Sequence, residues 1–384
     1  MALAMNERPT RRKIVLSVTS DLVSDYRVHR TALTLQQKCG MEVVVVGRKL
    51  RTSPPLSPRP YAVCRLSLPA EKGFLFYAGY NIVLFLYLMF NRFDLLWAND
   101  LDTLPANYLA AKLKRKKLIV DYHELFTGVP ELTGRDKVRR IWQWFERSML
   151  PAADVFFTVN QSIAAYYQKL YGLKAEVLRN VPYRPGEVPE VVLPWLGGDK
   201  KVIIYQGVVN VGRGLEKVIR AMSYLENAVF VIVGDGDVMD SVVALVKELK
   251  VEERVFFTGR VPFETLPSYL KKAHLGISLE EKMGESYFYA LPNKLFAYIQ
   301  AELPVLVSDF PEMKAIVEGY DIGRTTLEND PQRLAGLLDG MLRDVNEYER
   351  WKRNLKKAAR ELCWENEEQK LIDRMQGLVA KDWP

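Results

Sequence analysis

The stretch around Leu291-Pro-Asn-Lys294 carries residues that suit the binding of a phosphate group. Pro292 and Asn293 are typical of a helix start, and apolar positions at helical spacing follow them. A helix N-terminus presents unpaired N–H groups and a partial positive charge, and Lys294 adds a full one. The place therefore suits a diphosphate. Any αβ unit has such a helix start, however, so spacing alone leaves a purely structural role open.

Glycine-rich turns follow two other apolar segments. One contains Gly207, Asn210 and Arg213, and the second begins at Gly234. Glycines let the backbone approach a ligand closely, and Arg213 is a mobile cation at a helix start. Such turns are common, so they indicate an anion site only in combination with other signals.

Polar residues also follow two expected strands of the first half. Asp102 and Thr103 belong to a polar loop after the strand at 93–97, and His123 lies in Asp121-Tyr-His-Glu124. In α/β proteins, ligands bind at the carboxyl ends of the strands. His123 is thus a candidate site residue, with a structural role equally open, and Asp102 or Thr103 can also serve as a helix cap.

Composition narrows the class of protein. The chain has 384 residues, 48% of them hydrophobic, which is enough for two domains with real cores. Its net charge of +7 is compatible with nucleic acid, an anionic membrane or phosphorylated ligands. No aromatic stacking platform, zinc finger or helix-turn-helix pattern is present in the sequence, so nucleic acid is not an expected partner. Three scattered cysteines and three histidines apart from them predict a reducing compartment and no metal site.

Continuous apolar runs predict the elements that position these residues. Such runs, separated by helical patterns, are typical of parallel sheets covered on both faces. The strands expected in the first half span 13–18, 41–46, 61–66, 93–97, 118–121, 155–159 and 176–178. The pattern then restarts with strands expected at 201–205, 229–233, 254–257, 275–279 and 305–307.

The expected fold class is α/β, with two doubly wound, Rossmann-like domains facing across a cleft. We expect a first domain over 1–180, a proline-rich linker over 181–199, a second domain over 200–360, and a final helical segment over 361–384.

Two helical segments of the first half invite a membrane interpretation. Residues 73–91 carry no charge, but they are slightly short for a span and lie between two strands of one sheet, which favours a buried or surface-dipping helix. Residues 137–150 combine basic and aromatic residues in an amphipathic pattern, which suits either an anionic membrane or packing on the sheet. The inward face expected for that helix consists of Val138, Ile141, Trp142, Phe145 and Met149. The N-terminus lacks an apolar run of signal-peptide length, so a cytoplasmic location is expected.

Taken together, these motifs make the sequence resemble the retaining glycosyltransferases of family 4, which have the GT-B fold. The resemblance is carried by Asp121-Tyr-His-Glu124, Gly207 with Arg213-Gly214, Val231-Ile-Val-Gly-Asp-Gly236, Phe257-Thr-Gly259, and Leu291-Pro-Asn-Lys-Leu-Phe followed by Leu303-Pro-Val. It runs over nearly the whole chain. It implies a nucleotide-sugar donor held by the second domain and a lipid-linked or polysaccharide acceptor held by the first, with no metal or other cofactor required. It also implies that the final helices, from about Trp364, cross back to the first domain. A peripheral place at the inner face of the cell membrane would suit such an acceptor.

The resemblance also implies roles for single residues. His123 matches the family histidine beside the transferred sugar, and Arg213 matches the basic residue that neutralises the donor diphosphate. Leu291, Pro292 and Asn293 match the loop that holds the phosphates, with Lys294 directly after it.

The sequence departs from the family where two glutamates are expected eight positions apart. Tyr289 and Ala297 stand there instead, and Glu281 and Glu285 are the nearby carboxylates that can substitute. An active transferase is therefore one hypothesis. A catalytically weak or inactive relative, kept as a binding or partner subunit of a glycan-assembly complex, is another. A GT-B nucleotide-sugar epimerase is less favoured, since no acid and base carboxylates are found for it.

Overall fold

The computed structural model describes residues 11–189, 191 and 200–380, and the chain divides into two compact α/β units. One unit runs to Arg179 and includes the chain again from Glu368, while the other comprises Asn180–Glu367. The linker expected over 181–199 lies partly outside the described residues, because 190 and 192–199 are not among them.

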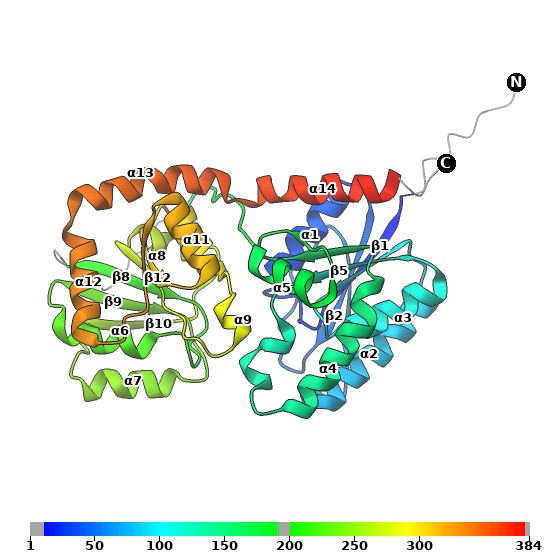
Figure 1. Ribbon diagram of the computed structural model, residues 1–384, viewed down its shortest axis with the longest axis horizontal. Coiled ribbons are helices and arrows are strands. Elements are labelled where there is room, and N and C mark those ends of the chain that lie inside the picture. The colour runs from blue at the N-terminus through cyan, green and yellow to red at the C-terminus, as the bar shows by residue number, and fades with distance from the viewer. Residues whose placement is uncertain (1–10, 190, 192–199, 381–384) are drawn as a thin grey trace, which may run out of the picture. The chain divides into compact units, whose positions relative to one another are not determined.

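The first unit is built on a seven-stranded sheet in the order β3-β2-β1-β4-β5-β6-β7, and its paired strands are parallel (Figure 1). Its strands are β1 (Lys13–Ser17), β2 (Glu42–Lys49), β3 (Ala62–Ser67), β4 (Leu95–Asn99), β5 (Lys117–Tyr122), β6 (Val155–Thr158) and β7 (Glu176–Val177). The helices that connect them are α1 (Tyr26–Gln37), α2 (Gly73–Phe90), α3 (Leu104–Lys114), α4 (Asp136–Met149) and α5 (Gln161–Tyr171), with short 3₁₀ turns η1 (Phe126–Gly128), η2 (Pro130–Leu132) and η3 (Leu150–Ala152).

The second unit repeats the plan with six strands in the order β10-β9-β8-β11-β12-β13. Its strands are β8 (Lys201–Gln206), β9 (Ala228–Val233), β10 (Val255–Gly259), β11 (Leu275–Ser278), β12 (Val305–Ser308) and β13 (Gly323–Thr326). Its helices are α6 (Leu215–Ala221), α7 (Met239–Glu248), α8 (Leu266–Lys271), α9 (Glu285–Phe288), α10 (Asn293–Gln300), α11 (Pro311–Tyr320), α12 (Pro331–Arg343) and α13 (Val345–Glu361), with the 3₁₀ turn η4 (Met222–Tyr224) after α6.

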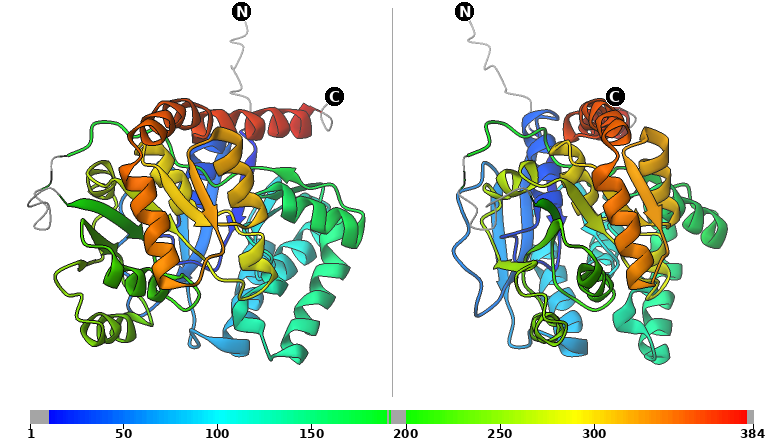
Figure 2. Two further views of the ribbon diagram at one scale, coloured as in Figure 1. Left: turned by 60° about the vertical axis from the view of Figure 1, so that its left-hand side comes forward. Right: turned by 90° about the vertical axis from the view of Figure 1, so that its left-hand side faces the viewer.

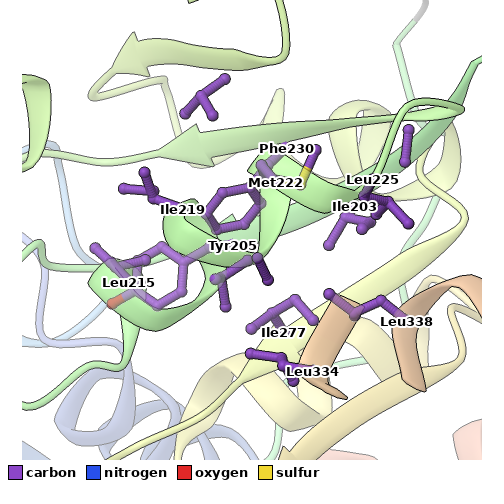
Figure 3. Packing of buried hydrophobic residues seen from close by; sticks show 14 of the residues in the cluster. Ile203, Tyr205, Leu215, Ile219, Met222, Leu225, Phe230, Ile277, Leu334 and Leu338 are labelled. Atoms are coloured by element: carbon purple, nitrogen blue, oxygen red, sulfur yellow. The ribbon is translucent and has the colours of Figure 1, made fainter. Parts of the chain in front are cut away.

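The core of the second unit forms where strands and helices bury alternate apolar side chains. Ile203 and Tyr205 on β8 are two residues apart and therefore point to one face of the sheet, where they meet Phe230 of β9 and Ile277 of β11 (Figure 3). Leu334 of α12 packs on the same cluster, and Figure 2 shows α12, in orange, lying against these strands in both views. This burial fixes the ends of β8 and β11.

The last helix, α14 (Trp364–Ala380), belongs largely to the first unit. Thr34 on α1 donates a hydrogen bond to Glu368, and Arg374 pairs with Glu176 of β7 at 2.8 Å. These contacts tie the end of the described chain to the sheet on which the chain begins.

In doubly wound proteins, ligands bind at the edge of the sheet where the order of the strands reverses. Strand order reverses between β1 and β4 in the first sheet and between β8 and β11 in the second. Outside the carboxyl ends of such strands, the loops diverge and leave room for a ligand. The loop after β4 holds Asp100 and Asp102, and His123 directly follows the neighbouring strand β5. In the second unit, the loop after β8 holds Arg213.

The structure corrects the expected inner face of α4 and decides between the two arrangements expected for α2. In α4, Trp142 and Met149 are buried as expected, but Val138 and Ile141 are exposed, and Glu146 takes an inward position because Tyr167 and Tyr171 donate hydrogen bonds to it. In α2, only one stripe of side chains is buried, consisting of Phe76, Tyr80, Leu84 and Leu88. The helix therefore lies at the surface, which is one of the two arrangements expected for it.

Candidate active site

His123 lies between two carboxylates at the carboxyl edge of the first sheet. Its Nδ1 is 3.2 Å from Asp100 Oδ2 and its Nε2 is 3.3 Å from Asp121 Oδ2, while its peptide N–H donates to Asp100 Oδ1 at 2.7 Å. Burial opposes the charge on the ring, but Asp100 and Asp121 outweigh it and raise the pKa of His123 to about 9. The ring is therefore an imidazolium at neutral pH and cannot act there as a general base.

Arg27 of α1 fixes the inner carboxylate of this cluster. Its Nε and Nη2 donate to the two oxygens of Asp121 at 3.0 and 2.6 Å, and its Nη1 donates to the carbonyl of Leu178. Burial alone would raise the pKa of Asp121, but Arg27 and His123 bring it well below its usual range. Arg27 thus keeps Asp121 ionised and oriented toward His123.

Asp102 is the carboxyl group of this edge with the fewest partners. Thr19 donates to its Oδ2 at 2.6 Å, while its Oδ1 is buried and has no hydrogen-bond partner within the described part of the chain. Burial and the nearby Asp100 raise the pKa of Asp102 to about 7. An unsatisfied buried oxygen of this kind is suited to accept a hydrogen bond from a hydroxyl group of a ligand.

In the second unit, two close approaches of backbone shape the turns that follow β8 and β9. A Cβ on Gly234 would lie 1.9 Å from the carbonyl oxygen of Gly207, and a Cβ on Gly214 would lie 2.0 Å from that of Leu279. Both glycines have positive φ, +144° and +71°, which other residues rarely adopt. The Gly207–Gly214 turn is thereby pressed against the end of β11, which brings Arg213 next to Glu280.

Glu280 is the centre of the second cluster. Its Oε1 is 2.8 Å from the Nζ of Lys294 and 3.9 Å from the Nη1 of Arg213, and Ser278 donates to its Oε2 at 2.8 Å. Burial opposes ionisation, but Lys294 and Ser278 lower the pKa of Glu280 below its ordinary value. Two cations therefore surround one buried carboxylate, and one positive charge is left over.

Arg213 is the more exposed of the two cations. Its guanidinium lies 4.8 Å from the centre of the Tyr287 ring, and its side chain is 26% exposed. Its Nε is buried and makes no hydrogen bond within the described residues. A buried donor beside an exposed guanidinium suits an oxygen-rich anion.

Lys294 differs from the expectation of a free cation at a helix start. Its side chain is only 8% exposed, its Nζ pairs with Glu280, and the same atom lies 4.3 Å from the centre of the Tyr205 ring. The helix start itself is as expected, since α10 begins at Asn293 with Pro292 before it and no side chain caps it. Backbone N–H groups and Arg213 thus provide the accessible positive potential. Lys294 adds its positive charge from a buried position.

The other predicted donor-binding residues occupy three settings. Asn210 accepts a hydrogen bond from the peptide N–H of Asp237, so its side chain holds the two turns together. Glu281 and Glu285 are exposed on the segment between β11 and α10, and a role for either in ribose binding stays a prediction. The remaining ones line the start of α10 or precede it: Tyr289 after α9, buried Leu291, and half-buried Ala297 on α10.

Two residues of this edge were not predicted from the sequence. Glu280 is one, and the available signal was its position two residues after Ser278, where a strand ends. Lys217 on α6 is the other. Burial lowers the pKa of Lys217, against the opposing effect of Glu281 and Glu280, so it is a partly buried cation near the same turn.

Comparisons with known proteins agree on the family. The model described as "Glycosyl transferases group 1" matches residues 196–358, and "Glycosyltransferase Family 4" matches residues 26–182. An uncharacterized glycosyltransferase of Methanocaldococcus jannaschii is 30% identical over 174 residues, which are 44% of this chain and 43% of that protein. The match thus spans less than half of that relative's length.

Solved structures agree on the fold. Sucrose-phosphate synthase from Thermosynechococcus elongatus has a TM-score of 0.78 at 18% identity, covering 97% of this chain and all of that one. HepE of Anabaena in complex with UDP-glucose has a TM-score of 0.71 at 14% identity, covering 95% and 99%. WaaG, a glycosyltransferase involved in lipopolysaccharide biosynthesis, also reaches 0.71 at 14%, covering 95% and 100%.

The fold defined by these likenesses is GT-B, in which two Rossmann-like units are joined in one chain. The chain belongs to the group 1 glycosyltransferases of the family 4 type, and it is a glycosyltransferase by class.

Proposed function

We propose that the protein is a retaining glycosyltransferase that moves a hexose from a nucleotide-diphosphate sugar to a lipid-linked or polysaccharide acceptor in cell-surface glycan synthesis. The observation that carries the proposal is the cluster of Arg213, Glu280 and Lys294 beside the uncapped start of α10, which leaves one positive charge and a buried free donor. That arrangement suits the diphosphate of a donor. Structural neighbours of the same fold carry UDP and UDP-glucose, which supports a nucleotide sugar.

In the proposed reaction, the bond between the anomeric carbon and the diphosphate oxygen breaks as the acceptor oxygen bonds to that carbon from the same side. The proton of the acceptor hydroxyl passes to the departing diphosphate. Arg213 and the N–H groups of α10 stabilise the developing negative charge, and preorganised charge of this kind is usually the largest catalytic contribution. The imidazolium of His123 orients the sugar and does not take a proton. Chelators should leave turnover unchanged, because protein groups neutralise the negative charge of the phosphates.

The proposed place of the protein is cytoplasmic and peripheral, at the inner face of the cell membrane, where a lipid-linked acceptor is available. Support comes from the exposed basic residues of α4, such as Lys137 and Arg140. Such residues are attracted to anionic lipids.

The second candidate is a catalytically weak or inactive subunit of a glycan-assembly complex. It is favoured by one observation, the replacement of both expected glutamates by Tyr289 and Ala297. Under this proposal the charge cluster persists as a binding site, with little or no transfer.

A product assay separates the two. The purified protein is incubated with UDP-, GDP- and ADP-hexoses and membrane lipid extract, and the anomeric proton of the product is read by NMR. Transfer with the donor's anomeric configuration supports the first candidate. Transfer with inverted configuration contradicts retention, and donor binding without any product favours the second candidate.

A further inference from the structure

The helix α2 carries the largest concentration of exposed apolar side chains among the described residues. Its outer surface holds Phe74, Leu75, Ile82, Leu86 and Phe90, whose exposed fractions lie between 47% and 85%. Large exposed apolar patches on soluble proteins mark sites of interaction. The helix is 18 residues long with a mean hydropathy of 1.7, and only 22% of it is buried.

Its inner surface explains why this helix stays on the sheet. Tyr80 donates to the carbonyl oxygen of Val18 at 2.6 Å, and Asn81 donates to that of Asp102 at 2.7 Å. Asn81 also accepts from the peptide N–H of Ala106 at 3.1 Å. The helix is thus fastened to the loops at the polar edge of the first sheet, and these bonds would be lost if it crossed a bilayer.

Two neighbouring helices continue the surface. Figures 1 and 2 show α2, α3 and α4 side by side, and Tyr77 of α2 meets Trp142 of α4 with ring centres 5.3 Å apart. On α4, a shallow pocket is lined by Lys137, Arg140, Ile141 and Trp144. On α3, Leu109 and Leu113 are exposed.

Most charges around this surface are basic, with Glu71 and Asp136 as acidic neighbours. Lys72 and Arg92 flank α2, and residues 72–92 contain no acidic residue. Basic residues also end α3, where Lys114 donates to the carbonyl oxygens of Leu88 and Asn91 and so closes the C-terminus of α2. An apolar face with a cationic rim and a tryptophan beside it matches the layering of an anionic phospholipid bilayer, with acyl chains below phosphates.

We propose that the outer face of α2, together with the Lys137–Trp144 face of α4, inserts into the surface of an anionic phospholipid bilayer. α2 lies parallel to the membrane with its apolar side chains among the acyl chains, while Lys137 and Arg140 contact lipid phosphates and Trp144 lies at the level of the headgroups. Through Asn81, the inserted helix holds the loop of Asp102 close to the lipid surface. The inference deepens the peripheral location in the proposed function, but binding to lipid requires neither donor nor transfer.

The test uses the full chain and vesicles of phosphatidylglycerol with phosphatidylcholine, compared with phosphatidylcholine alone. Flotation should recover the protein with the anionic vesicles. Replacing Lys137 and Arg140 by glutamine should weaken binding by about fivefold per cation, as expected for ~1 kcal/mol each near an anionic surface. The matched control is Arg353→Gln with Lys356→Gln on α13, which removes two exposed cations at the same spacing from the second unit. An equal loss in the control would overturn the assignment to α4.

Insertion of α2 is tested separately with an environment-sensitive label. Leu75 on α2 and Val345 on α13 are both 72% exposed, which makes them a matched pair for single cysteine substitution. The half-buried Cys39 and Cys64 are replaced by alanine in both proteins. Anionic vesicles should shift the emission of a label at Leu75→Cys to the blue and leave the label at Val345→Cys unchanged.

An unchanged label at Leu75→Cys on vesicle-bound protein would overturn the insertion of α2. Ile82→Ser with Leu86→Ser should lower vesicle affinity by about tenfold per side chain, since each loses apolar burial. If those substitutions instead convert a dimer to a monomer without altering vesicle binding, the face is an interface between copies of the chain and the proposal fails.

Discussion

Both sheets hold a buried polar cluster where the order of their strands reverses, but the two clusters differ in the charge that is left uncompensated. In the first unit, three carboxyl groups surround two cations, Arg27 and His123. In the second, two cations surround the single carboxylate of Glu280. The first cluster therefore offers acceptors for hydroxyl groups, whereas the second attracts an anion. Similar topology thus supports different chemistry, and the residues at the strand ends decide which.

The buried pair in the second cluster gives the largest expected effect. Glu280→Gln leaves the Lys294 ammonium buried without a counter-charge, and removing one partner of a buried ion pair costs about 3–5 kcal/mol. We expect a denaturant titration to show that the free energy of unfolding of the second unit is lower by that amount. Glu280→Gln combined with Lys294→Met should recover much of the loss. A stability of the single variant equal to wild type would show that the pair is not buried as described.

Arg213→Ala should mainly affect catalysis. Loss of a preorganised group that stabilises the leaving diphosphate lowers turnover by about 100- to 1,000-fold. The thermal midpoint should change little, because the side chain is partly exposed. Arg220→Ala, which removes an exposed basic residue on α6, the helix that follows the turn of Arg213, is the control and should keep its activity. Unchanged sugar transfer in the Arg213 variant would show that Arg213 does not stabilise the leaving diphosphate.

The stability that the first cluster contributes should fall as pH rises, whereas the stability contributed by an ordinary carboxylate ion pair increases as pH rises. The pKa of His123 is raised to about 9 in the folded chain, above its unfolded value near 6.5, so its stabilising contribution is present below about pH 6.5 and is lost as pH rises through about 9. The stability of the first unit should fall over that window, by at most about 3 kcal/mol at ~1.36 kcal/mol per pKa unit.

The measurement is the thermal midpoint of the first unit from pH 6 to 10, with the imidazole resonances followed by NMR. His123→Gln should flatten this dependence. Asp102, whose pKa is raised to about 7, loses its contribution earlier, between about pH 4 and 7. A wild-type profile that is flat from pH 6 to 10 would contradict the ionised state assigned to His123.

The smallest expected effect concerns the missing ribose carboxylate. Ala297→Glu should tighten donor binding by about tenfold, the equivalent of one charge-assisted hydrogen bond of ~1.5 kcal/mol. Ala297→Gln is the neutral control and should gain less. Calorimetric titration measures both. No gain with glutamate would mean that the ribose is held differently from the family pattern.

The sequence predicted most strands of both sheets because continuous apolar runs report burial on both faces. It did not predict β13, a Gly-Arg-Thr-Thr strand that is only half-buried. Expected strands such as those at 13–18 and 201–205 agree with β1 and β8 to within one residue. It predicted the inner face of α4 only in part. Helical spacing places Val138 and Ile141 near Trp142. Which face of the helix is buried depends, however, on partners such as Tyr167, which donates a hydrogen bond to the buried Glu146. Those partners come from a distant segment.

The candidate sites show the same limit. Motifs and spacing pointed to His123, Arg213 and the start of α10, but they did not predict that Lys294 is paired or that His123 is clamped. Both properties arise from residues on another loop, since Glu280 lies 14 positions from Lys294 and Asp100 lies 23 positions from His123. Glu280 was missed because a glutamate after a strand is ordinarily solvent-exposed, and only the tight turn at Gly214 and the packing of Lys294 enclose it.

A thermal-shift titration tests whether the second cluster binds a nucleotide diphosphate. The full chain is heated with uridine, guanosine or adenosine diphosphate and their hexose conjugates, in parallel with Arg213→Ala. A ligand at about a hundred times its dissociation constant stabilises the folded state by ~2.7 kcal/mol, which moves a midpoint by roughly 5–10 °C. We expect such a shift with one base in the wild-type protein and its loss in the variant. No shift with any nucleotide at millimolar concentration, or an equal shift in both proteins, would contradict it.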